Sequence, residues 1–122
     1  MTISLKQLEM NKSRREKLNA IIMLLMCLDK MNGNEILPKL KEAAAKLEDV
    51  YEDEQIALDS MPDNLQYSAR ADMFNDNIDN LNDAMIDLGL VIDEYAKSGR
   101  FDNVQEEISS VINNCTEAIE RR

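Results

Sequence analysis

The chain has 122 residues and a formal net charge of −10, with 24 Asp and Glu residues against 14 Lys and Arg residues. This length suffices for one hydrophobic core but not for two, so we expect a single domain over residues 1–122. The acidic excess works against direct binding of nucleic acid or of an anionic membrane, because affinity for phosphates comes from basic side chains. The expected partner is therefore a basic protein surface.

The residue types argue against catalysis. Histidine is absent, which removes the usual general base and the usual transition-metal ligand. The three glycines are isolated and form no phosphate-binding loop. Residues 75–86 are partly similar to a calcium loop, but Asn80 stands where the loop requires Gly and Ile86 stands where it requires Glu. We expect no enzymatic activity, no catalytic residue, no cofactor and no metal.

No targeting segment is predicted. The N-terminus has neither an apolar stretch before Ile21 nor a small-residue cleavage pattern, so it does not match a signal peptide. The longest apolar run, residues 21–28, is far shorter than the about 20 residues that span a bilayer. Cys27 and Cys115 each fall in an apolar helical stripe, which predicts two buried thiols, with a disulfide or a reactive thiol as the alternative. The chain is expected in the cytoplasm.

The first predicted helix starts at Ser4 or at Ser13, because each begins a capping box. The later start would leave residues 1–12 as a flexible tail. Asn32-Gly33 would end the helix with a left-handed residue. Its apolar side chains cover more of the circumference than a simple amphipathic helix needs, as in a central bundle helix or an oligomer interface. The interface residues that we expect are Ile21, Ile22, Leu25 and Met26.

A second helix is predicted from Asn34 to the turn at residues 61–64, because proline lacks an amide hydrogen and Asn and Asp favour turns. Its apolar residues alternate steps of three and four, as in the seam of a coiled-coil helix. Glu54 is the single charged residue in this seam. The apolar members are Leu37, Leu40, Ala44, Leu47, Tyr51, Leu58 and Met61.

The third predicted helix, from about Ser68 to Lys97, combines an apolar seam with an acidic outer face. The seam consists of Phe74, Ile78, Leu81, Met85, Leu88, Ile92 and Tyr95. A row of acids at steps of four and three lies outside it and consists of Asp72, Asp76, Asp79, Asp83 and Asp87. Ile86 and Leu90 interrupt the outer face, which predicts that the helix is covered on a second side toward its C-terminal end.

A final helix is predicted from Asp102, after Ser98-Gly99 has ended the third. Helical periodicity without strand-like alternation predicts an all-α fold. We expect the second and third helices to form a long antiparallel hairpin with coiled-coil-type packing. The first and last helices should cover it as in a bundle, within one chain or exchanged with a second copy.

Residues 61–70 read Met-Pro-Asp-Asn-Leu-Gln-Tyr-Ser-Ala-Arg, and residues 78–81 read Ile-Asp-Asn-Leu. This region resembles a group of small phage and prophage proteins that share a Pro-Glu-Asn-Leu-Gln-x-Ser-Glu-Arg turn before an acidic helix with Ile-Asp-Asn-Leu. Asp63 and Ala69 depart from the two Glu residues of that pattern. The resemblance covers residues 61–84 only, implies a phage-type helical hairpin, and supplies no catalytic residue.

Between Leu47 and Ala96 the chain has fourteen acidic residues and one basic residue, Arg70. A solvated helix usually mixes the two signs, so this imbalance predicts a surface that binds a basic protein. Carboxylates one helical turn apart are about 5 to 6 Å apart along the axis, so their row could imitate nucleic acid. The predicted function is a phage-encoded inhibitor of a host or defence protein, like phage anti-restriction and some anti-CRISPR proteins, binding through Asp72, Asp76, Asp79, Asp83 and Asp87.

The alternative is a structural or oligomerisation module. A run of charges often only keeps a helix soluble. The functional surface would then be the apolar first helix, as a dimer interface or as a groove for a partner helix. Under either hypothesis we expect a homodimer.

Overall fold

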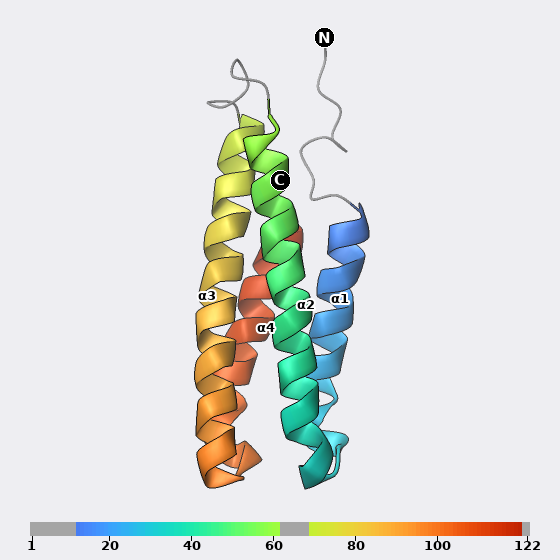
Figure 1. Ribbon diagram of the computed structural model, residues 1–122, viewed down its shortest axis with the longest axis vertical. Helices are drawn as coiled ribbons and strands as arrows, with labels where there is room; N and C mark the ends of the chain where they lie inside the picture. Colours follow the sequence, from blue (N-terminus) through green and yellow to red (C-terminus); the bar gives the residue numbers. More distant parts are fainter. Residues whose placement is uncertain (1–11, 62–68, 121–122) are drawn as a thin grey trace.

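The computed structural model describes residues 12–61 and 69–120, and within these ranges the fold is a bundle of four α-helices without strands (Figure 1). The all-α prediction is confirmed. Short 3₁₀ helices, η2 and η4, lie in two of the connections. The elements are α1 (Lys12–Met26), η2 (Leu28–Lys30), α2 (Gly33–Asp59), α3 (Ala69–Ser98), η4 (Phe101–Val104) and α4 (Gln105–Glu120).

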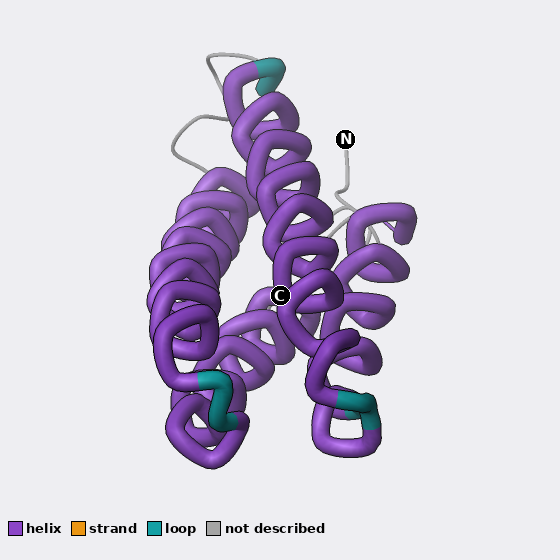
Figure 2. The backbone as a smooth tube through the Cα atoms, turned by 60° about the horizontal axis from the view of Figure 1, so that its bottom comes forward, coloured by secondary structure: helices purple, strands orange, loops and turns teal. Residues whose placement is uncertain are grey.

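The two long helices, α2 and α3, form the predicted hairpin, and the two shorter helices cover it (Figure 1). α1 packs against α2, whereas α4 packs against α3 and also contacts α1. The connections from α1 to α2 and from α3 to α4 lie at the same end of the bundle, as a second view also shows (Figure 2). Of the predicted tail over residues 1–12, Lys12 is the first residue of α1, and residues 1–11 lie outside the described residues, as do residues 62–68 of the connection between α2 and α3.

Glycine ends one helix and begins another. Gly99 has a φ of 65° and its N–H donates to the Tyr95 carbonyl at 2.8 Å, so Ser98-Gly99 ends α3 as predicted. The left-handed stop predicted at Asn32-Gly33 is wrong. α1 already ends at Met26, and Asn32, at a φ of −68°, is the N-cap of α2.

The predicted seam of each long helix consists of two rows of residues, each row at steps of seven. In the structure one row is buried as predicted, and residues one position earlier are buried in place of the other row. In α3 the row of Phe74, Leu81, Leu88 and Tyr95 is buried as predicted, but the row of Ile78, Met85 and Ile92 is only half-buried. The residues one position earlier are buried in its place, namely Asn77, Ala84 and Val91. α2 shows the same shift, with Ile36, Ala43 and Val50 buried in place of Leu37, Ala44 and Tyr51.

This shift follows from the number of neighbours of each helix. A two-helix coiled coil buries one narrow seam, whereas each hairpin helix here also packs against α1 or α4. The buried sector therefore widens and turns toward the covering helix.

A polar layer crosses the core where α1, α2 and α3 meet. Arg14 Nε donates to Glu54 Oε1 at 2.5 Å, and Asn77 Nδ2 donates to Glu54 Oε2 at 3.4 Å. Glu54 and Asn77 are both fully buried. Glu54 therefore lies in the buried seam of the second helix, as predicted, and the cation that pairs with it comes from α1.

The polar layer divides the apolar interior into two clusters. Val50 and Leu81, on one side of the layer along α2 and α3, belong to the main core. Phe74, on the other side, belongs to a smaller cluster near the hairpin turn that also contains Met61, Ala71 and Met73. The polar layer therefore lies between the main core and the smaller cluster along the length of the bundle.

Burial sets the protonation of Glu54. Desolvation raises the pKa of the Glu54 carboxyl above its ordinary value, although the charge and the hydrogen bond of Arg14 act in the opposite direction. The folded chain thus binds a proton at Glu54 more tightly than the unfolded chain does. The stability from this difference is fully present below the ordinary pKa of 4.5 and is lost as the pH rises through the folded-state pKa.

We expect Arg14→Met to lower the free energy of unfolding by about 3 to 5 kcal/mol near neutral pH, because it leaves a buried carboxylate without its cation. Without the guanidinium the pKa of Glu54 rises further. The difference from the parent chain should therefore shrink as the pH falls toward about 5. Urea denaturation of both chains across this pH range measures the effect.

Lys17→Met is the matched control, because Lys17 joins α1 to α2 through Asp53 on the surface, with Nζ 3.3 Å from Oδ2. An exposed pair of this kind contributes about 1 kcal/mol or less, so the variant should lose little stability at any pH in the range. Equal losses in the two variants, or a loss in Arg14→Met that does not depend on pH, would contradict a buried ion pair.

Leu88 and Leu90 test the inward and outward faces of α3. Leu88 is fully buried and Leu90 is 58% exposed. We expect Leu88→Ala to lower the free energy of unfolding by about 2 to 5 kcal/mol and Leu90→Ala to change it by about 0.5 kcal/mol or less. Thermal or urea unfolding measures both. Similar losses would show that α3 is rotated from the position described.

Candidate functional site

The outward face of α3 is the candidate interaction surface. Along steps of four and three it consists of Asp72, Asp76, Asp79, Asp83, Ile86, Leu90, Asp93 and Lys97. Apolar residues in the buried rows hold the opposite side of the helix against α2 and α4. The acids are therefore displayed outward because the core fixes the rotation of the helix.

The five acids predicted to bind a partner are not equally available. Asp72, Asp79 and Asp83 are exposed, and none of them has an ion-pair or hydrogen-bond partner among the described residues. Asp87 is half-buried and accepts a hydrogen bond from Ser110 Oγ of α4 at 3.1 Å. Asp76 is half-buried and also interacts within the chain. The available row is therefore shorter than the sequence suggests.

Ile86 and Leu90 do not become covered within the chain. They are 56% and 58% exposed. α4 does pack on the C-terminal half of α3, where Ser110 donates a hydrogen bond to Asp87, but it leaves Ile86 and Leu90 on the outer face exposed. The prediction that a further helix covers α3 is confirmed, since α4 packs on it, but the expectation that this contact covers Ile86 and Leu90 is wrong.

Some of the additional apolar side chains of α1 are buried in the core of the same chain. Ile21 and Leu25, two of the four residues expected at an oligomer interface, are fully or almost fully buried in the core. They are therefore not surface positions in this structure, because α1 packs against both α2 and α4. Ile22 is half-buried and Met26 is exposed, so an interface on α1 can use only these two of the expected residues.

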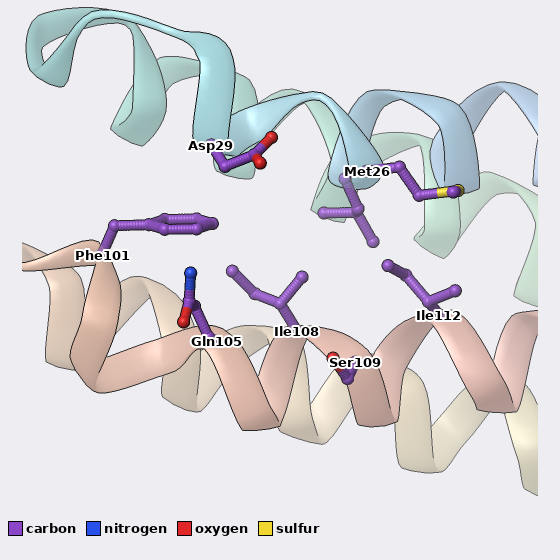
Figure 3. A pocket seen from close by; sticks show the side chains of 8 residues that line it. Met26, Asp29, Phe101, Gln105, Ile108, Ser109 and Ile112 are labelled. Atoms are coloured by element: carbon purple, nitrogen blue, oxygen red, sulfur yellow. The ribbon is translucent and has the colours of Figure 1, made fainter.

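A groove lies between the C-terminal end of α1 and the beginning of α4 (Figure 3). Its volume is about 270 Å³. Met26 and Asp29 line one side, and Phe101, Ile108 and Ile112 line the other. Gln105 and Ser109 add polar groups to the side formed by α4, and no residue of α3 lines the groove.

The two cysteines differ in exposure. Cys115 is fully buried in the core, and burial raises the pKa of its thiol to about 12. Cys27 is exposed, and both thiols are free. The expectation of a buried thiol is therefore wrong for Cys27. It follows the last residue of α1 and no longer continues the periodicity of that helix.

The described residues give no indication of other chemistry. No group of three or more Cys, Asp and Glu residues among them is arranged to hold a metal ion. None of the helices in these ranges is both long and apolar enough to cross a membrane.

Comparison of the chain with protein-family models, with curated proteins and with solved structures gives no match. The resemblance of residues 61–84 to phage proteins therefore stays a prediction.

We expect one fast-reacting thiol in the folded chain. Cys27 should react with an aromatic disulfide reagent at the rate of an exposed thiol, and Cys115 should react only after unfolding, because it is buried and largely protonated. Absorbance with and without denaturant counts the reactive thiols. The Cys27→Ser variant should lose the fast phase, and a fast phase that persists in this variant would contradict the burial of Cys115.

Proposed function

We propose that the chain is a non-enzymatic protein-interaction module that binds a basic protein surface through the outward face of α3. The observation that carries the proposal is the set of exposed carboxylates at Asp72, Asp79 and Asp83, for which the described residues supply no cation. Fixed charges of one sign on a rigid helix attract an oppositely charged partner over about 10 Å at moderate salt. Such a face favours fast and salt-dependent association.

The resemblance to phage proteins supports a more specific form of the proposal. A phage-encoded acidic protein can inhibit a host or defence protein in the bacterial cytoplasm by occupying its nucleic-acid-binding surface. Of the exposed acids of α3, Asp79 and Asp83 are one helical turn apart, about 6 Å along the axis, and Asp72 lies about two turns before Asp79. A groove built for phosphates could accept carboxylates at such intervals. The target would be a basic protein, and the chain itself would not bind DNA or RNA.

The alternative, a homodimer that forms through α1, rests on fewer residues than the sequence predicts. Met23 and Met26 are 66% and 62% exposed and could contact a second copy. Ile21 and Leu25 are unavailable because they lie in the core. Dimerisation and the binding of a basic partner use different faces, so the two proposals are compatible.

The salt dependence of partner capture tests the proposed function. The immobilised chain should retain basic proteins from a bacterial lysate at about 50 mM salt and release most of them at about 300 mM, because screening weakens exposed charge pairs. Duplex DNA should compete with the chain for these proteins. We expect retention to fall at least about fivefold in a variant with Asn at Asp72, Asp79 and Asp83.

A variant of equal net charge serves as the control. It carries Gln at three exposed acids outside α3, which are Glu35, Glu48 and Glu117. Retention by this control should stay close to that of the parent chain. If salt has no effect, or if the two variants lose retention equally, the acidic face of α3 is not the binding surface.

A further inference from the structure

The acidic face of α3 has an apolar centre. Ile86 and Leu90 are four residues apart, so their side chains adjoin on one face of the helix, and both are more than half exposed. Asp79 and Asp83 precede them on this face and Asp93 follows. An apolar centre with a charged rim is the usual arrangement of a protein-binding hot spot.

A groove beside Leu90 extends this surface toward α4. It lies between α3 and the residues around the start of α4 and has a volume of about 290 Å³. Val91 and Val104, which belong to the core, line it, and the exposed acids Glu94 and Glu107 also line it. Neither carboxylate has an ion-pair or hydrogen-bond partner among the described residues. An apolar side chain that enters the groove would therefore bring a neighbouring Lys or Arg close to two carboxylates.

We propose that Ile86, Leu90 and the adjoining groove form a docking face for an amphipathic helix whose apolar side is flanked by Lys or Arg. The inference rests on the proposed function and specifies the partner of the same face. The apolar residues of the partner cover Ile86 and Leu90, and its cations pair with the acids on either side. Charge then governs the rate of association, whereas the apolar contact governs the lifetime of the complex.

A second copy of the chain that packs through its own α3 does not fit this face. Two α3 helices packed through Ile86 and Leu90 would bring Asp83 and Asp93 of one copy close to acids of the other. Each chain also has a net charge of −10. Like charges across an interface oppose association, whereas a cationic helix matches both the apolar pair and the carboxylates around it.

Two synthetic peptides of equal charge separate the apolar contact from simple charge attraction. One is an amphipathic helix of Leu and Lys, and the other has Gln in place of every Leu. Each is titrated into the full chain labelled with nitrogen-15. We expect the Leu-containing peptide to bind at least about tenfold more tightly, because it covers the apolar pair. The largest amide shifts should centre on Ile86 and Leu90.

Paired substitutions locate the contact. Ile86→Ser with Leu90→Ser should reduce the affinity for the Leu-containing peptide to that for the Gln-containing peptide. Met23→Ser with Met26→Ser removes the other exposed apolar pair, on α1, and should leave the difference unchanged. All four side chains are exposed, so we expect both variants to fold, which circular dichroism checks.

The possible outcomes distinguish the docking face from the proposed function. Equal affinities of the two peptides for the parent chain would overturn the docking face and leave the proposed function, since charge alone would account for binding. Shifts that centre on α1, or a loss of the difference in the Met23 and Met26 variant, would also overturn it. If neither peptide binds, both proposals are wrong.

Discussion

A carboxylate removed from water governs how this bundle is assembled. Glu54 sits at the level where three helices meet, and a buried charge is tolerated only when a cation and hydrogen bonds accompany it. Arg14 supplies the cation from α1, and Asn77 supplies a hydrogen bond from α3. Apolar packing alone would allow helices to slide by a turn with little loss, whereas this polar layer accepts one register. It fixes α1 and α3 relative to α2 at a single level.

The exposed surface follows from that register. Once Asn77 faces Glu54, the neighbouring rows of α3 face α2 and α4, and the Asp residues on the opposite side face solvent. The same rotation leaves Ile86 and Leu90 in the open, between acids. A helix that only needed to remain soluble would have no reason to combine an apolar pair with so few compensating cations. The proposed binding of a basic partner rests on these features of the outward face of α3.

Much of the fold could be predicted from the sequence, because the hairpin helices have strong periodicity and clear end signals. The row of Leu81 and Leu88 was predictable, and so was the stop at Gly99. The burial of Asn77 in place of Ile78 was not predictable, because it depends on which helix covers α3. The pairing of Arg14 with Glu54 joins residues 40 positions apart, and no local pattern specifies such a contact. Cys27 was misplaced because the apolar stripe of α1 was extended beyond the end of the helix.

The pKa of Glu54 in the folded chain tests the buried polar layer most directly. The carbon-13 shift of its carboxyl group, assigned by comparison with the Glu54→Gln variant, can be followed through a pH titration. A buried carboxyl should titrate above 4.5, in step with the backbone amides of Arg14 and Asn77. Titration near the ordinary value of 4.5, without a response at these two residues, would place Glu54 in water and would contradict the register on which the exposed face of α3 depends.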